Sequence, residues 1–384
     1  ICVPIDIRVK GDQLRYMLSE VGAKVLITNS SLLAPIAPIL SRLESAPNII
    51  TNDRAEGVEF LWDALEGDGE EFEVPLMGDD EALYLYTSGT TGVPKAVVLT
   101  CNHLDLFPDS MMAFYSREDM ETLGLLLPMS HISGPVCVNL VLAMGGRVVI
   151  FDDLRPDVVF SIIERERVSL FHAVPPIFQA LLQYPEVERF DLSSLRIVAM
   201  MGMAVPISLM KAFRRRFAPT VVVQGYGLTE TSPLLTLVPS EMAEVKMGSI
   251  GKPVPRAEIR LVDDEGRELP PGDIGEIVVR GPQVMKGYFN DPEATASIIR
   301  DGWLHTGDLG MFDQDGYLYH MGRKKELIIT GGLNVHPAEV EAVILGHPKV
   351  KEAAVVGIPD LKRGEAIKAV VVVKEGEKLT KREL

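Results

Sequence analysis

The chain has 384 residues, of which 47% are hydrophobic and 24% are charged, and its formal net charge at pH 7 is −16. A chain of this length and composition can bury a sizeable core in two or three domains. The acidic balance argues against a general binder of nucleic acid or of anionic membranes, because phosphate-rich surfaces attract an excess of lysine and arginine. One small anionic ligand, held locally, is compatible with this charge. No apolar run reaches the roughly 18 residues of a membrane span, so we expect no membrane-spanning helix.

The cysteines and the chain ends carry further expectations. Cys2, Cys101 and Cys137 are scattered without a CxxC pair, which argues against a disulfide framework or a zinc site and favours a reducing, cytoplasmic location. The chain opens on Ile1 without a signal-peptide pattern, and its last residues, "KLTKREL", resemble the start of a helix. We therefore expect a fragment of a longer protein, truncated at both ends.

Short β-rich runs alternate with amphipathic stretches up to about residue 248. Apolar, β-branched runs predict buried strands over 24–28, 83–87, 96–100, 147–151, 195–200 and 220–224. Between them, apolar residues at helical spacing predict helices over 11–21, 102–113, 156–168 and 206–217. This alternation predicts α/β subdomains with largely parallel sheets.

The pattern of apolar and polar residues changes twice after residue 248. From about 249 to 321, apolar and polar residues alternate between Pro-Gly turns, which predicts a half-exposed, antiparallel, distorted β-barrel. From 325 to 384, a predicted helix over 337–345 and β-rich runs predict a small, incomplete α+β domain. The prediction is therefore a large domain over 1–324, followed by part of a small C-terminal domain.

The stretch "YTSGTTGVPK", residues 86–95, joins two predicted strands and is rich in small and hydroxylated residues. Its glycines permit positive φ and close backbone approach, and its turn can aim backbone N–H groups at an anion. Lys95 adds a positive charge. The stretch lacks the GxxxxGK[ST] spacing of a Walker A loop. On composition alone, a plain surface loop and a phosphate site both stay open.

Two more stretches hold candidate ligand-binding residues. In "QGYGLTET" (224–231), which follows a predicted strand, Glu230 could hold Mg²⁺, Thr229 a phosphate oxygen and Tyr226 the face of a base. Helix capping by the same Thr and Glu is the alternative. In "WLHTGDLG" (303–310), Asp308 could pair with a ribose diol, although a Gly-Asp pair is also ordinary turn chemistry. His131 in "PMSHISG" could line a pocket or be a structural histidine.

In this order, "YTSGTTGVPK", "QGYGLTET", "GEIVVRGPQVMKGYFNDPEAT", "DGWLHTGDLG" and "GRKKELIITGGLNVHPAEVE" resemble the adenylate-forming superfamily of acyl-CoA synthetases, luciferases and peptide-synthetase adenylation domains. The resemblance is strongest to fatty-acid and related acid–CoA ligases, and it covers nearly the whole chain. It implies an AMP-forming ligase that uses ATP, Mg²⁺ and coenzyme A on a carboxylic acid. No nucleic acid partner is implied, and the acid and the oligomeric state are not given by the sequence.

The resemblance also implies roles for individual residues. It places Thr229, Glu230, Lys95 and His131 among the catalytic residues, with Glu230 as the Mg²⁺ ligand and His131 near the acyl carboxylate. The nucleotide would be held by Thr87, Ser88, Gly89, Thr90, Thr91, Gly92, Gly202, Met203, Ala204, Gly225, Tyr226, Gly227, Asp308, Arg323 and Lys325. Lys325 falls at the hinge of the small domain, and Gly331, Gly332 and Leu333 fall where that domain meets the thiol. The expected acyl pocket comprises His131, Ser133, Val174, Met200, Met201, Met203 and Tyr226.

Some positions depart from the superfamily pattern. Met203 stands where glycine is common, and Ile329 where luciferase-like members have lysine. The superfamily's catalytic lysine near the C-terminus would lie beyond Leu384, so we expect the chain alone to adenylate poorly. Three alternatives stay open: a ligase that loads a carrier-protein thiol, a nucleotide-binding protein without catalysis and, third, a generic P-loop NTPase.

Overall fold

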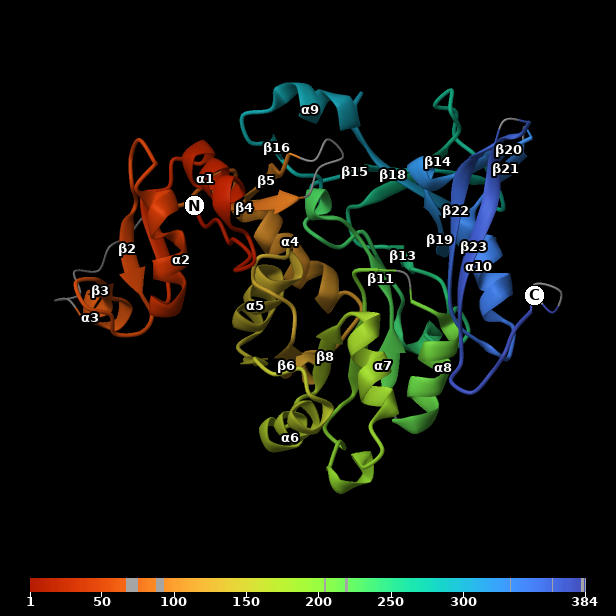
Figure 1. Ribbon diagram of the computed structural model, residues 1–384, viewed down its shortest axis with the longest axis horizontal. Coiled ribbons are helices and arrows are strands. Elements are labelled where there is room, and N and C mark those ends of the chain that lie inside the picture. The colour runs from red at the N-terminus through yellow and green to blue at the C-terminus, as the bar shows by residue number, and fades with distance from the viewer. Residues whose placement is uncertain are drawn as a thin grey trace.

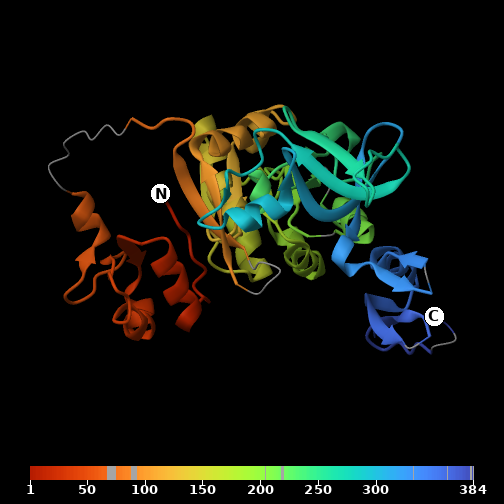
Figure 2. The ribbon, with the colours of Figure 1, turned by 90° about the horizontal axis from the view of Figure 1, so that it is seen from above.

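The computed structural model describes residues 1–66, 75–87, 93–203, 205–217, 220–331, 333–360, 362–380 and 383. Two perpendicular views show the N-terminal elements at one end of the molecule and the C-terminal sheet at the other (Figures 1 and 2). Between them lie a parallel α/β unit and an antiparallel sheet. The N-terminal end is a three-stranded parallel sheet with its helices: α1 (Gly11–Glu20), β1 (Val25–Thr28), α2 (Ser30–Leu40), β2 (Asn48–Thr51), β3 (Glu59–Phe60) and α3 (Leu61–Leu65).

The central unit is a five-stranded parallel sheet in the order β10-β9-β8-β6-β7. Its strands are β6 (Thr122–Leu125), β7 (Arg147–Ile150), β8 (Leu170–Ala173), β9 (Ile197–Met200) and β10 (Val221–Val223). Its helices are α4 (Cys101–Met112), α5 (Ser133–Met144), α6 (Pro156–Glu166), α7 (Pro175–Gln183) and α8 (Ile207–Arg216). The predicted strands and helices of this region therefore form. Strands β6 and β8 and helices α5 and α7 were not among the predicted elements.

Successive side chains of these strands alternate between two core clusters. One cluster lies under α4 and α5 and includes Leu125, Leu170, Ile197 and Val223. The other lies under α6, α7 and α8 and includes Phe171, Val198, Met200 and Val222. Because both faces are covered by helices, the strands are continuously hydrophobic, which is typical of a parallel sheet. The carboxyl ends of all five strands consequently meet at one edge of the sheet.

Two of the predicted strands pair outside the parallel sheet. The runs predicted at 83–87 and 96–100 form β4 (Glu81–Thr87) and β5 (Lys95–Thr100), which pair antiparallel. The reason is chain length, because a parallel pair requires a crossover of about a dozen residues or more, and only 88–94 separate these strands. Strand β16 (Gly287–Tyr288) adds to β5, also antiparallel. The glycine- and hydroxyl-rich stretch thus connects adjacent antiparallel strands.

The next region is antiparallel and curved, in the part of the chain predicted as a distorted barrel. One sheet contains β14 (Glu258–Val262), β15 (Ile274–Arg280), β17 (Ile299–Arg300), β18 (Trp303–Phe312) and β19 (Leu318–Arg323). A smaller sheet contains β11 (Gly225–Tyr226), β12 (Thr236–Leu237) and β13 (Lys252–Pro253). Lys246 ties the region together, since its Nζ lies 2.8 Å from Asp313 and 2.5 Å from Asp315.

The C-terminal sheet has the order β21-β20-β23-β22 and packs against one helix. Its elements are β20 (Ile328–Thr330), β21 (Leu333–Val335), α10 (Pro337–Leu345), β22 (Val350–Asp360) and β23 (Gly364–Val373). The predicted domain boundary between residues 324 and 325 falls in the 3-10 turn η5 (Lys324–Glu326) and stays a prediction. Within the described parts of the chain, none of the helices has both the length and the apolar character needed to cross a membrane.

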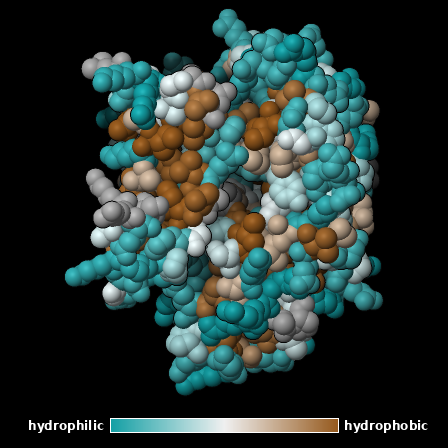
Figure 3. Space-filling view, turned by 90° about the vertical axis from the view of Figure 1, so that its right-hand side faces the viewer, coloured by the Kyte–Doolittle hydropathy of each residue, from teal (hydrophilic) through white to brown (hydrophobic). Residues whose placement is uncertain are grey.

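Apolar residues gather on the side of the molecule that carries β22 and β23, among polar ones (Figure 3). The exposed apolar side chains of these two strands are Val356, Ile358, Ile367, Val370 and Val372. The opposite face of the strands contributes Val350 and Val355 to the small core beneath α10. Among the described residues, helix packing therefore covers one face of this sheet.

Phe178 provides a test of the central core. Its ring is fully buried and meets Phe171 and Phe213 edge-on, at centroid distances of 5.7 and 5.3 Å. We expect Phe178→Ala to lower the free energy of unfolding by about 3–5 kcal/mol, because it leaves a cavity among rings that cannot collapse. Leu142→Ala, on the exposed face of α5, should change it by less than about 0.5 kcal/mol. If denaturant titrations show the same loss of unfolding free energy in Phe178→Ala and Leu142→Ala, this description of the core is wrong.

Candidate active site

A buried carboxylate, Asp308, joins segments that are far apart in the sequence. It lies in β18 with only 2% of its surface exposed. The Tyr226 hydroxyl donates a hydrogen bond to Asp308 Oδ2 over 2.7 Å, and Arg323 Nε lies 3.1 Å from Oδ1. His320 Nε2 lies 3.8 Å from the same Oδ1. Three of the predicted nucleotide-binding residues, Tyr226, Asp308 and Arg323, are therefore in direct contact.

The surroundings of Asp308 hold it in the ionised form. Burial by itself raises the pKa of a carboxyl group, but the nearby His320, the hydrogen bond from Tyr226 and the charge of Arg323 outweigh it, so the pKa of Asp308 is lowered. Burial and the Asp308 charge raise the pKa of Tyr226 well above its usual value, so the phenol stays a donor. Although Arg323 is close, no described residue gives Asp308 Oδ1 a well-aligned hydrogen bond. That oxygen can accept one from a ligand.

The turn that presents Tyr226 depends on two glycines. A Cβ atom on Gly227 would lie 1.4 Å from the Pro233 carbonyl oxygen, and one on Gly225 would lie 2.8 Å from the Thr236 oxygen. Both approaches are shorter than real Cβ contacts, so any side chain would force the returning segment away. The short pairing of β11 with β12 therefore requires glycine on both sides of the tyrosine.

A second cluster surrounds Glu230, which lies in the 3-10 turn η3 (Thr229–Thr231). The Tyr288 hydroxyl donates a hydrogen bond to Glu230 Oε1 over 2.9 Å. Lys95 Nζ lies 5.3 Å from the centroid of the same tyrosine ring and forms an ion pair with Asp291 Oδ2 at 3.1 Å. Burial and the charge of Glu230 raise the pKa of Tyr288, which keeps its hydroxyl protonated. One neutral ring thus lies between a carboxylate and a cation.

Strand pairing brings the members of this second cluster together. Pairing of β16 with β5 places Tyr288 opposite Val97, two residues beyond Lys95. The Met285 N–H donates a hydrogen bond to the Glu230 carbonyl oxygen over 2.9 Å, which fixes η3 beside β16. Asp291 begins α9 (Pro292–Ile298) and accepts a hydrogen bond from the Ala294 N–H over 2.9 Å. Its other oxygen, Oδ2, holds the Lys95 ammonium.

Five more predicted residues within the described parts of the chain lie outside the side-chain contacts of these two clusters. Thr87 faces Lys95 across the β4–β5 pair, and Thr229 begins η3. His131 lies between β6 and α5, where solvent reaches it, yet the protein atoms around the ring lower its pKa. Gly202 follows β9 with φ +90°, and Lys325 is exposed in η5.

Some predictions cannot be placed, and two acyl-pocket residues lie differently from expectation. Residues Ser88, Gly89, Thr90, Thr91, Gly92, Ala204 and Gly332 lie outside the described residues. Met203 is 56% exposed, so it is not buried in a pocket wall in this structure. Met200 is fully buried in the core beneath α7 and α8, on the face of the sheet opposite to α5. The remaining site assignments stay predictions.

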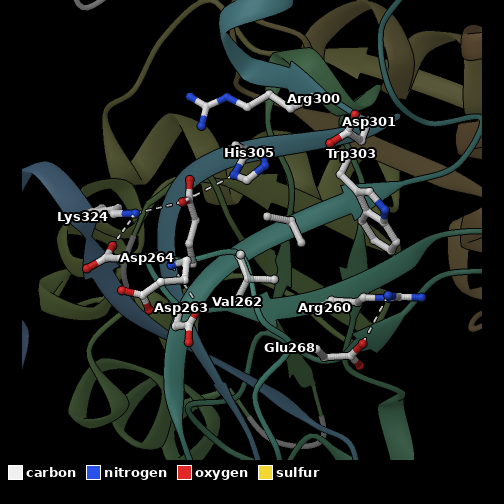
Figure 4. Close-up of a pocket in the computed structure, with 14 residues that line it drawn as sticks. Arg260, Val262, Asp263, Asp264, Glu268, Arg300, Asp301, Trp303, His305 and Lys324 are labelled. Atoms are coloured by element: carbon white, nitrogen blue, oxygen red, sulfur yellow. Dashed lines mark hydrogen bonds and ion pairs between the residues drawn. The ribbon is translucent and has the colours of Figure 1, made fainter.

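A separate cavity of about 400 Å³ lies on the outer side of the antiparallel sheet (Figure 4). Trp303 and His305 line it from β18, and by the alternation of a strand they face away from Asp308. Lys324 bridges Asp264 and Glu276 at its edge, at 2.9 and 3.1 Å. Several of its carboxylates and cations are already paired with each other. The cavity is therefore not the predicted nucleotide site.

The sequence analysis missed three side chains that complete the two clusters: Tyr288, Asp291 and His320. Tyr288 and Asp291 lie within the quoted stretch "GYFNDPEAT", but their contact with Lys95 follows from strand pairing that the sequence does not show. His320 faces Asp308 because β18 and β19 pair antiparallel. The turn sequence "DQDG" (313–316) between these strands is the local indication of that pairing.

Comparison with known proteins gives matches over most of the chain. The family model of the AMP-binding enzymes matches residues 1–289, and that of the AMP-binding enzyme C-terminal domain matches 339–384. A feruloyl-CoA synthase from Amycolatopsis sp is 38% identical over 386 residues, which cover 100% of this chain and 75% of the relative.

Solved structures give the same result for the fold. The amide bond synthetase McbA from Marinactinospora thermotolerans matches with a TM-score of 0.87 at 32% identity. This match covers 98% of the present chain and 74% of the McbA chain. The O-succinylbenzoate coenzyme A synthetase MenE from Bacillus subtilis, in complex with ATP and magnesium ion, has a TM-score of 0.79 at 32% identity, with 97% and 74% covered. The predicted fold class, α/β subdomains with a distorted barrel and a small α+β domain, is confirmed.

Tyr226→Phe tests whether the buried carboxylate depends on its phenolic donor. The variant leaves Asp308 Oδ2 without that bond, so we expect a loss of about 1–3 kcal/mol in the free energy of unfolding at pH 7. Since the bond lowers the pKa of Asp308, this difference should shrink as the pH falls through the folded-state pKa. The matched control is Tyr16→Phe, which removes a bond to Glu20 and should cost little, because Glu20 keeps its hydrogen bond from Tyr86. If Tyr226→Phe and Tyr16→Phe lower the free energy of unfolding equally, the contact between Tyr226 and Asp308 is not formed.

Proposed function

The chain belongs to the AMP-binding enzyme family, and on that premise we propose that it joins a carboxylic acid to coenzyme A at the expense of ATP. In the first step a carboxylate oxygen attacks the α-phosphorus of ATP, which forms an acyl-AMP and releases pyrophosphate. In the second step the thiolate attacks the acyl carbonyl carbon and releases AMP. The predicted membership of the adenylate-forming superfamily is confirmed.

The observation that carries the proposal is the Asp308 carboxylate, whose Oδ1 receives no aligned hydrogen bond from the described residues. A buried, ionised carboxylate that pairs with Arg323 and keeps spare acceptor capacity at Oδ1 suits a ribose diol, which supplies two hydroxyl donors. The Arg323 guanidinium offsets the charge of Asp308, so a neutral sugar fits this place. Tyr226 adds a flat apolar ring directly beside the carboxylate, where a base could stack.

The Glu230 cluster suits the phosphates. Mg²⁺ usually binds one or two carboxylates together with substrate phosphates. Glu230 fits this pattern, because the described residues contain no group of three or more His, Cys, Asp or Glu side chains that could hold a metal by themselves. Bound Mg²⁺ would neutralise charge on the phosphates. Lys95, released from Asp291, could contribute a second cation beside it.

No side chain of these clusters needs to act as a nucleophile. Attack on phosphorus requires alignment of the carboxylate with the leaving pyrophosphate and neutralisation of developing charge. Tyr288 orients Glu230 through a 2.9 Å bond, and Asp291 holds Lys95 at 3.1 Å, so both charged groups are positioned before a ligand arrives. We propose positioning and charge neutralisation as the chemical contribution of this chain.

The acceptor of the acyl group separates the competing functions. A carrier-protein thiol would replace coenzyme A without changing the first step, and an amine is a third candidate because the similar McbA is named an amide bond synthetase. Supplying free coenzyme A, a phosphopantetheinylated carrier or a primary amine to the acyl-AMP distinguishes them by product. A nucleotide binder without catalysis would form no acyl-AMP in any of these assays.

Exchange of labelled pyrophosphate into ATP by the full-length protein tests the first step. We expect exchange that depends on a carboxylic acid and on Mg²⁺. Glu230→Gln should lower its rate about 100-fold, since the amide keeps the shape but loses the charge that holds the ion. The control Glu56→Gln changes an exposed carboxylate far from the clusters and should have no effect. Absence of acid-dependent exchange over a broad acid panel would refute the proposal.

Asp308→Asn tests the ribose assignment separately from catalysis. We expect AMP to bind about 10–100-fold more weakly by calorimetry, because a charged acceptor is replaced by a neutral amide. The same variant should bind inorganic pyrophosphate as tightly as the parent protein, since that ligand has no sugar. Asp273→Asn, on an exposed turn of the antiparallel sheet, is the matched control. If Asp308→Asn binds AMP as tightly as the parent protein, Asp308 does not bind the ribose.

A further inference from the structure

A histidine inside the central sheet has one ring nitrogen without a partner. His172 lies in β8, opposite Leu125 of β6 and Ala199 of β9, and only 7% of its surface is exposed. Its Nδ1 lies 3.6 Å from Cys137 Sγ, in the first turns of α5. Its Nε2 is buried and has no hydrogen-bond partner among the described residues. An unpaired polar atom in such a place costs free energy unless something else pairs with it.

The Cys137 contact determines which hydrogen-bonding role the free nitrogen has. Burial raises the pKa of the Cys137 thiol to about 12 and lowers the pKa of His172 to about 4, so both groups are neutral at pH 7. A neutral thiol carries a hydrogen that it can donate to Nδ1. When the thiol donates in this way, the neutral imidazole holds its single proton on Nε2. In that tautomer, on which the inference rests, the free nitrogen is an N–H donor that lacks an acceptor among the described residues.

The position of His172 places this donor beside the expected acyl-binding region. His172 is the next-to-last residue of β8, and His131 follows the adjacent strand β6, so both lie toward the carboxyl ends of neighbouring parallel strands. Two residues beyond His172, Val174 Cγ1 lies 3.6 Å from the position of a Cβ on Gly202. The ends of β6, β8 and β9 thus converge where open α/β sheets bind ligands.

We propose that His172 determines acid specificity by donating a hydrogen bond from Nε2 to an oxygen that the acid carries away from its reacting carboxylate. The inference rests on the ligase activity proposed above and narrows its substrate class to acids with such an acceptor, for example an oxygen on an aryl ring. A neutral donor suits a neutral oxygen, because an anion would be better served by a cation. A purely hydrocarbon acid would leave the donor unpaired.

Matched acid pairs test the inference in the full-length protein by pyrophosphate exchange. Each pair differs only by an oxygen: ferulic against cinnamic acid, 4-methoxybenzoic against benzoic acid, and 8-hydroxyoctanoic against octanoic acid. For at least one pair, we expect the parent protein to favour the oxygenated acid in kcat/KM by about 10-fold or more. In His172→Leu that preference should disappear, while kcat/KM for the hydrocarbon acid stays within about 3-fold.

His103 offers a control, since it is another buried histidine with both nitrogens paired. Its Nδ1 contacts Thr100, and its Nε2 lies 2.8 Å from the Val284 carbonyl oxygen. His103→Leu can therefore destabilise the fold but should leave the acid preference of the parent protein unchanged. His172→Gln, which retains an N–H donor, should retain part of the preference for the oxygenated acid.

Nitrogen-15 NMR of the parent protein gives a second measurement that needs no variant. We expect His172 to carry its proton on Nε2, and its Nε2 resonance to shift when the oxygenated acid is added but not its hydrocarbon partner. An unchanged acid preference in His172→Leu, or a proton on Nδ1, would overturn the inference and indicate that a buried water satisfies the ring. If none of the tested acids supports pyrophosphate exchange by the parent protein, the ligase proposal itself fails.

Discussion

The contact between Asp308 and Tyr226 is the interaction on which the arrangement of the candidate site depends. It joins β18 of the antiparallel sheet to the turn that follows the central parallel sheet, 82 positions earlier in the sequence. A buried carboxylate is costly unless its partners supply hydrogen bonds and opposite charge. Tyr226 supplies a hydrogen bond from β11 and Arg323 supplies the opposite charge from β19, where His320 also lies close to the carboxylate. The carboxylate therefore fixes how the two sheets meet.

This constraint extends toward the C-terminal sheet. Arg323 is the last residue of β19, and η5 follows at once with Lys324 paired to Asp264 and Glu276. The chain is thus anchored on both faces of the antiparallel sheet, by Arg323 on the Asp308 side and by Lys324 on the side of the cavity in Figure 4. Any movement of the C-terminal sheet about η5 would begin beyond these two anchors. Such a movement would leave the carboxylate cluster intact.

Much of this architecture could be predicted from local sequence. Continuous apolar runs identified β7, β9 and β10, and helical spacing identified α4, α6 and α8. The runs that became β6 and β8 were missed because Gly124 and His172 interrupt the expected composition of a buried strand. The runs over 83–87 and 96–100 were predicted as strands, but their antiparallel pairing was not, because composition carries no direction. Motifs located Asp308 and Glu230, but their partners Tyr288 and His320 depend on long-range pairing.

The distribution of unpaired buried atoms supports the same location for the site. Among the described residues, six buried side-chain atoms have no hydrogen-bond partner, and three of them belong to His172, Gln224 and Asp308. His172 and Gln224 lie at the carboxyl end of the parallel sheet, and Asp308 faces the turn that follows it. In the scaffold, by contrast, His103 has both nitrogens paired. Stability alone would favour pairing everywhere. The other three unpaired atoms belong to Ser194, Gln283 and His305, so the argument for the site rests on the three near this edge, where a ligand can complete the bonding.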